Sequence, residues 1–279
     1  MKRNILSLLI SIPFLCQFSP AIDRMEKTWP FFQPCQPVRP LQVMAHRGAA
    51  MAAPENTLPA IALAVESGFE WVEIDIRLTQ DGHHVIFHDE SLEGKTNGQG
   101  LIHNKTLEEI QSLDAGSWFA SRFSETRIPT LKEVLSYAKE KINLYLDCKD
   151  IEPELLIHEI LQQGMENQVA IYDNVDRLTT IHTLANGKIP LMVKCHHESE
   201  LPSLIDRVHP AILEVNMEDM TPTLVDAAHR EGILVQANTL GENDKPEVWK
   251  SLLETKADFI QTDFPDLVQA AYFHHTVKN

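Results

Sequence analysis

Residues 143–172, NLYLDCKDIEPELLIHEILQQGMENQVAIY, contain a strand-like run, an amphipathic stretch and a second strand-like run. The first run covers 143–148, the second covers 169–172, and the helix-length stretch between them covers 153–163. A strand, a helix and a strand in this order predict a βαβ unit, whose two strands lie parallel in one sheet.

The same alternation extends over the rest of the chain from residue 41. Further strand-like runs occupy 42–45, 71–78, 84–88, 190–194, 211–216, 233–238 and 258–262. Helix-length segments separate most of them, so the pattern predicts an α/β fold, and we expect a (β/α)8 TIM barrel over residues 41–279. A doubly wound open sheet is the alternative, since alternation alone does not distinguish the two folds.

Two irregularities modify this pattern. Asp81-Gly82 joins the runs 71–78 and 84–88 and is typical of a hairpin turn, so one of the nine strand-like runs is expected to lie outside an eight-stranded barrel. Residues 89–128 contain scattered glycines and only one helical stretch. In a compact domain such a long irregular segment usually has a function, and we expect it to be an insertion after the third strand.

Residues 1–21 have the pattern of a secretory signal peptide. A basic start precedes the apolar stretch 5–14, and Ser19-Pro20-Ala21 supplies small residues for cleavage. The apolar stretch is shorter than the ~20 residues that span a bilayer. We expect a secreted or periplasmic protein without stable membrane insertion after cleavage, and an uncleaved anchor is the alternative. The proline-rich residues 22–40 are expected to form an extended arm before the barrel.

The charge balance narrows the class of partner. The chain has 24 Lys and Arg residues against 40 Asp and Glu residues, a formal net charge of −16. Proteins that bind nucleic acid or anionic membranes draw affinity from Lys and Arg. We therefore expect a small-molecule ligand and no nucleic acid, while the sequence leaves the oligomeric state open.

Polar side chains gather where four of the predicted strands end, which is where a TIM barrel places its active site. Two of them, Glu73 and Asp75, are spaced two residues apart and lie on one face of their strand. The full set comprises two histidines, three carboxylates and two cations: His46, Arg47, Glu73, Asp75, His88, Asp147 and Lys149.

This set of residue types points to phosphate chemistry. Three carboxylates at one point repel one another unless a cation lies among them, and oxygen ligands favour Mg²⁺ or Ca²⁺. We expect Glu73, Asp75 and Asp147 to hold one divalent cation. Arg47 and Lys149 are suited to a bound phosphate. The two histidines, with no nucleophilic Ser or Cys nearby, are expected to form an acid–base pair for phosphoryl transfer or phosphodiester cleavage.

The order of these groups resembles the glycerophosphodiester phosphodiesterase family over residues 42–265. The motifs that carry the resemblance are His46-Arg47-Gly48, Pro54-Glu55-Asn56-Thr57, Glu73-Ile74-Asp75, His88-Asp89, Thr96-Asn97-Gly98, Asp114-Ala115-Gly116-Ser117-Trp118, Ile128-Pro129-Thr130-Leu131 and Gln261-Thr262-Asp263. The resemblance implies a TIM barrel with a segment inserted after the third strand. It also implies hydrolysis of glycerophosphodiesters to glycerol 3-phosphate and an alcohol.

The resemblance implies roles for the matched side chains. His46 and His88 match the family's catalytic pair. Glu73 and Asp75 match two metal ligands, and Arg47 matches a phosphate-binding residue. In the family a substrate hydroxyl beside the phosphate is thought to attack phosphorus, with one histidine taking its proton and the other protonating the leaving alcohol. The sequence does not assign the two roles.

The chain departs from the family at two places. The third metal ligand of the family is usually a Glu followed two residues later by Lys, whereas this chain has Asp147 before Lys149. Many relatives carry Trp-Thr-Val-Asn or similar in the run 233–238, where this chain has Val235-Gln236-Ala237-Asn238. This polar side of the mouth favours a small polyol head group over a long acyl chain.

Two other functions remain open from the sequence. The first is a phospholipase D-type cleavage of lysophospholipids or sphingolipids on the same barrel. The second is a secreted protein that binds polyol phosphates without cleaving them, to which the change to Asp147 lends some support. Retention of both histidines and of Lys149 argues against the second, because a binding protein needs no acid–base pair.

Asn56 and Thr57 precede Leu58-Pro59 and have the residue types that cap a helix N-terminus. We expect a structural cap there. Asn56 is also a candidate to orient the neighbouring His46.

Overall fold

The computed structural model describes residues 31–34 and 39–276, with side chains as far as residue 272. The expected signal peptide over residues 1–21 and most of the expected arm over residues 22–40 lie outside this part of the chain. None of the helices described is long and apolar enough to cross a membrane.

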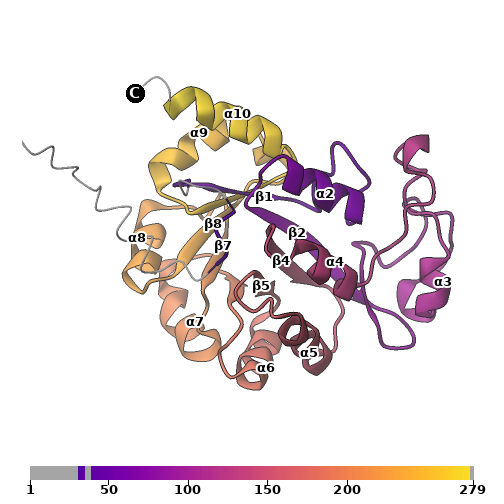
Figure 1. Cartoon of the computed structure of the whole chain (residues 1–279). Helices are drawn as coiled ribbons and strands as arrows, with labels where there is room; N and C mark the ends of the chain where they lie inside the picture. Colours follow the sequence, from indigo (N-terminus) through magenta and orange to yellow (C-terminus); the bar gives the residue numbers. More distant parts are fainter. Residues whose placement is uncertain (1–30, 35–38, 277–279) are drawn as a thin grey trace, which may run out of the picture. The chain divides into compact units, whose positions relative to one another are not determined.

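The described strands include eight parallel ones that form a closed barrel, as the alternation predicted (Figure 1). They are β1 (Gln42–Ala45), β2 (Trp71–Leu78), β4 (Asn143–Cys148), β5 (Val169–Tyr172), β6 (Leu191–Lys194), β7 (Ile212–Asn216), β8 (Leu234–Asn238) and β9 (Phe259–Thr262). Neighbours pair in that order, and β1 pairs with both β9 and β2, Met44 lying beside Gln261 and Trp71. Closure excludes the open-sheet alternative and confirms the TIM barrel.

Helices surround the barrel (Figure 1). They are α2 (Leu58–Glu66), α4 (Leu131–Ala138), α5 (Pro153–Gln163), α6 (Val175–Ala185), α7 (Leu201–Val208), α8 (Pro222–Arg230), α9 (Pro246–Thr255) and α10 (Pro265–Thr276). Helix α4 illustrates the pattern: Leu131, Val134 and Leu135 are buried. At its start, the side chains and backbone amides of Thr130 and Glu133 form a capping box.

Strand β3 (His84–Ile86) is the extra strand. It pairs antiparallel with β2, Ile86 beside Ile76, and lies outside the barrel. The third strand expected from the sequence is therefore not a barrel strand, and the third strand of the barrel is β4. Two strands joined by a tight turn at Asp81-Gly82 can only pair antiparallel, whereas all barrel strands are parallel.

The segment between β3 and α4 is the insertion, and it lies to one side of the barrel (Figure 1). It contains the short helical elements η1 (Ile102–Asn104), α3 (Leu107–Gln111) and η2 (Ser121–Phe123). Its buried apolar side chains form a cluster of their own with β3: Val85, Phe87, Leu92, Ile102, Ile110, Ala115 and Ile128.

The described end of the N-terminal arm closes one end of the barrel. The Phe31 ring packs edge to face on Trp71 at 4.7 Å between centroids, and Trp71 packs on Phe259 at 5.5 Å. Asn143 Nδ2 donates to the carbonyl oxygen of Phe32 at 2.8 Å. Because Trp71, Asn143 and Phe259 begin their strands, the arm seals the end opposite the predicted site.

Candidate active site

The strand register places the three predicted metal ligands on the inner face of the barrel. Asp75 of β2 lies beside Asp147 of β4, and Glu73 lies beside Tyr145. Side chains alternate along a strand, so Glu73, Asp75 and Asp147 face the same way. One carboxylate oxygen of each lies within 4.8 Å of the others. The structure therefore brings these three carboxylates together at one point of the mouth.

The turn after β1 carries His46 and Arg47. Arg47 has a left-handed φ of 55° and Gly48 a φ of 88°. A Cβ atom on Gly48 would lie 2.9 Å from the Cβ of Ala60 in α2, so the close approach of the turn to the helix requires glycine. This geometry directs the Arg47 amide at Glu73, whose Oε2 accepts its hydrogen bond at 2.9 Å.

Both ring nitrogens of His46 have partners. Nδ1 lies 2.7 Å from Asp263 Oδ1, and this hydrogen bond holds the pKa of Asp263 below its ordinary value. An ionised carboxylate only accepts, so Nδ1 carries the ring proton. Arg47 Nε donates to Nε2 at 3.2 Å, which assigns the lone pair to Nε2. His46 is thus held with an unprotonated Nε2, which lies 3.8 Å from Glu73 Oε2.

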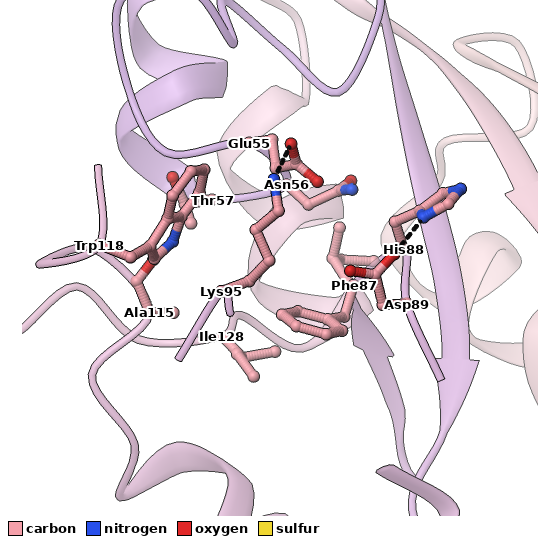
Figure 2. A pocket seen from close by; sticks show the side chains of 11 residues that line it. Glu55, Asn56, Thr57, Phe87, His88, Asp89, Lys95, Ala115, Trp118 and Ile128 are labelled. Atoms are coloured by element: carbon pink, nitrogen blue, oxygen red, sulfur yellow. Dashed lines mark hydrogen bonds and ion pairs between the residues drawn. The ribbon is translucent and has the colours of Figure 1, made fainter. Parts of the chain in front are cut away.

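His88 follows β3 and adjoins Phe87, whose amide donates to the Asp75 carbonyl oxygen at 2.9 Å. His88 Nδ1 lies 2.7 Å from Asp89 Oδ1 (Figure 2). Arg77 Nε donates to the His88 carbonyl oxygen at 2.7 Å and ties this residue to β2. The His88 side chain is 34% exposed, so its ring is accessible to a ligand.

Arg47 and Lys149 lie against the carboxylates. Lys149 Nζ is 2.7 Å from Asp147 Oδ2 and 3.2 Å from Asp75 Oδ1, and Arg47 Nε is 3.5 Å from Asp75 Oδ2. Burial by itself lowers the pKa of such cations, but the surrounding carboxylates outweigh it and raise the pKa of both. Both side chains are therefore firmly charged.

Asn56 positions Asp75, a role that was not expected. Its Nδ2 donates to Asp75 Oδ2 at 2.7 Å, and the Asp75 amide donates to Asn56 Oδ1 at 3.1 Å. The cap expected from Asn56 and Thr57 is found only in position: Thr57 is the N-cap residue of α2, but its side chain makes no cap hydrogen bond. A φ of 57° at Asn56 turns its side chain toward β2 instead.

Glu55 links Arg47 to the insertion. Its Oε1 lies 2.7 Å from Arg47 Nη1, and its Oε2 accepts a hydrogen bond from Lys95 Nζ at 2.9 Å. The Lys95 ammonium lies 4.2 Å from the ring centroid of Trp118. Figure 2 shows Glu55, Lys95 and Trp118 around a pocket that His88 also lines.

Three of the positioning residues, Glu55, Asp89 and Asp263, were given no role from the sequence, and Asn56 was expected to orient His46 rather than Asp75, although all four lie in motifs already quoted. Glu55 and Asn56 belong to Pro54-Glu55-Asn56-Thr57, Asp89 to His88-Asp89, and Asp263 to Gln261-Thr262-Asp263. Their signal was the presence of a second polar residue in each motif. Asp263 lies 217 positions from its partner His46 and Asn56 lies 19 positions from Asp75, so spacing along the chain does not reveal these two contacts.

Comparison with known proteins agrees with this geometry. A family model described as the glycerophosphoryl diester phosphodiesterase family matches residues 46–267. A glycerophosphodiester phosphodiesterase of Caldanaerobacter subterraneus is 33% identical over 240 residues, covering 80% of this chain and 94% of the relative. One from Bacillus subtilis is 38% identical over 265 residues, covering 84% and 86%.

Solved structures give the same result. A glycerophosphodiester phosphodiesterase of Agrobacterium tumefaciens has a TM-score of 0.76 and 27% identity, covering 82% of this chain and 99% of that one. An Oleispira antarctica phosphodiesterase, solved with the product sn-glycerol-3-phosphate, has a TM-score of 0.73 and 29% identity, covering 83% and 96%. The chain therefore belongs to the glycerophosphoryl diester phosphodiesterase family and is a phosphoric diester hydrolase.

Proposed function

We propose that this enzyme hydrolyses glycerophosphodiesters to sn-glycerol 3-phosphate and an alcohol, using one divalent cation and two histidines as base and acid. One observation carries the proposal. A histidine fixed as a base, His46, lies against a cluster of three carboxylates and two cations at the barrel mouth. Metal, cations and acid–base groups are the parts that phosphodiester cleavage needs.

The donor set fits a divalent cation. Glu73, Asp75 and Asp147 offer carboxylate oxygens within 4.8 Å of one another, which suits Mg²⁺ or Ca²⁺. Burial, with the charges of Asp75 and Asp147, raises the pKa of Glu73 well above its ordinary value, as expected where negative charge is concentrated. A bound cation would supply the opposite charge there and stabilise the phosphate oxygens in the transition state.

Arg47 and Lys149 bind and orient the phosphate. Both cations are already held by acidic partners, Arg47 by Glu55 and Lys149 by Asp147. Side chains fixed in this way lose little freedom when the substrate binds, which favours catalysis. The planar guanidinium also matches two phosphate oxygens at once.

The ring contacts support one assignment of the two proton transfers. His46 is the base, because Asp263 holds the proton on Nδ1 and Nε2 accepts from Arg47. His88, held through Nδ1 by Asp89, is the acid that donates from Nε2. Each carboxylate partner stabilises the positive charge of the imidazolium form of its histidine.

The reaction then runs in two balanced steps. The glycerol 2-hydroxyl gives its proton to His46 Nε2 and its oxygen bonds to phosphorus, while the bond from phosphorus to the alcohol oxygen breaks and His88 protonates that oxygen. The products are a cyclic phosphate and the free alcohol. Water next gives a proton to His88 and bonds to phosphorus, and the 2-oxygen leaves with the proton from His46. Both histidines return to their initial states.

A comparison of two substrates tests the proposal. With Mg²⁺ or Ca²⁺, the enzyme is expected to release glycerol 3-phosphate from glycerophosphocholine about ten or more times faster than it cleaves a long-chain lysophosphatidylcholine. The polar residues at the ends of β7 and β8 are the reason, since they offer no apolar surface to an acyl chain. Faster cleavage of the lysolipid would support the phospholipase D-type reaction, and binding without cleavage of either would support a binding protein.

We also propose that the enzyme acts in the periplasm or outside the cell. The signal-peptide pattern of residues 1–21 supports export. Mass spectrometry of the exported protein is expected to find a new N-terminus after Ala21. A full-length protein retained in the cytoplasmic fraction would contradict this.

A further inference from the structure

A second polar cluster lies at the mouth of the barrel, on β6, β7 and β8. Lys194 Nζ donates to Glu214 Oε1 at 2.7 Å and to Asn216 Oδ1 at 2.6 Å. Asn238 Nδ2 donates to the same Glu214 oxygen at 3.4 Å. Nothing in the proposed reaction uses these four side chains. Glu214 is only 3% exposed, and a carboxylate this buried needs partners such as Lys194.

The register shows that this cluster faces into the barrel. Lys194 lies beside Glu214 on the neighbouring strand, and Asn216 lies beside Asn238. Tyr145 of β4 crosses the interior and donates to Glu214 Oε2 at 2.7 Å. Because Tyr145 lies beside Glu73 in the register of β2 and β4, it connects the cluster to the three carboxylates.

The cluster lies on the opposite side of the mouth from His88. Strand β7 is four strands from β2 in either direction around the barrel, and His88 follows β3, which pairs with β2. In phosphoryl transfer the attacking and leaving oxygens lie roughly in line through phosphorus. If His88 protonates the leaving alcohol, the attacking glycerol lies on the far side, toward Lys194.

The chemistry of the cluster suits a hydroxyl group. Lysine has three N–H donors, and in the described part of the chain Glu214 and Asn216 accept two of them from Lys194, which leaves one for a ligand. The Lys194 side chain is 28% exposed, so this donor is accessible from the mouth. Asn216 and Asn238 add amides that both donate and accept, as a hydroxyl does.

We infer that Lys194, fixed by Glu214 and Asn216, binds the terminal hydroxyl of the substrate's glycerol group and thereby selects a polyol. This inference rests on the proposed function, since the in-line argument uses the role of His88. Holding the terminal hydroxyl places the neighbouring 2-hydroxyl for its attack on phosphorus. Lys194 is thus a residue that determines specificity for the glycerol side of the diester.

Calorimetric binding of two monophosphates tests the inference. In the presence of Mg²⁺, Lys194→Met is expected to lower the binding affinity for sn-glycerol 3-phosphate by about tenfold, because one hydrogen bond to a charged group is lost. The affinity for methyl phosphate, which has no alcohol hydroxyl, is expected to stay unchanged. Lys188→Met is the matched control, because Lys188 is an exposed lysine before β6. It is expected to bind both ligands like the wild type.

A second variant controls for misfolding of Lys194→Met. Lys194→Met leaves the buried Glu214 short of a partner, so Lys194→Met combined with Glu214→Gln removes both charges together. The same selective loss for sn-glycerol 3-phosphate supports the inference. If the affinity for both ligands falls equally, or if neither affinity falls, the inference is overturned. Binding needs no turnover, so a wild type that binds sn-glycerol 3-phosphate through Lys194 but cleaves no glycerophosphodiester would contradict the proposed function alone.

Discussion

Replacing His46 or His88 by alanine is expected to lower kcat on glycerophosphocholine by about 100- to 10,000-fold, the usual contribution of a general acid or base. His46→Ala removes the Nε2 lone pair that Arg47 and Asp263 hold in place. His88→Ala removes the proton donor held by Asp89. Steady-state kinetics on purified variants measures the effect, with KM expected to change little because the phosphate is bound by other residues.

His83→Ala provides the control for these variants. His83 is exposed and close to His88 in sequence, so its loss removes an imidazole without touching the site. We expect its kcat to equal that of the wild type. If either His46→Ala or His88→Ala kept wild-type turnover, the acid–base mechanism would be wrong.

Removing one of the three carboxylates is expected to have an effect of similar size. Glu73→Gln and Asp147→Asn each keep the shape of the side chain but remove one negative charge from a cluster within 4.8 Å. A divalent cation binds largely through such charges, so we expect metal affinity to fall and turnover at low metal to be lost. Titration of activity against Mg²⁺ and Ca²⁺ measures the apparent metal affinity of each variant.

Comparing Asp147→Glu with Asp147→Asn separates the charge of this side chain from its length. Asp147→Glu keeps the charge and is expected to retain activity, whereas Asp147→Asn is not, because the charge matters more than the length of the side chain. Glu254→Gln on α9 removes an exposed carboxylate and is expected to change nothing. Equal activity of Asp147→Asn and wild type at low metal would remove Asp147 from the metal site.

The barrel and the carboxylates were predictable because both follow from short-range patterns. Alternating strands and helices predicted the closed sheet, and spacing by two placed Glu73 and Asp75 on one face. Strand β3 is the run that lies outside the barrel, and its apolar residues do not themselves reveal whether the neighbouring strand is parallel or antiparallel. Only the Asp81-Gly82 turn indicated the antiparallel pairing.

The supporting contacts were not predictable in the same way. His46 meets Asp263 across 217 positions of sequence, and Asn56 reaches Asp75 from a loop rather than from a strand. The Lys194–Glu214 pair joins two strands whose register no pattern in the chain specifies. Such pairs depend on barrel closure and on backbone conformations such as the left-handed φ of 57° at Asn56.

Release of glycerol 3-phosphate from glycerophosphocholine, with and without EDTA, tests the central proposal most directly. We expect turnover by the purified wild type, its loss in EDTA, and its recovery when Mg²⁺ or Ca²⁺ is restored, because Glu73, Asp75 and Asp147 are proposed to hold the cation. Undiminished turnover in EDTA would contradict metal dependence. No release of glycerol 3-phosphate with either metal would contradict the proposed reaction itself.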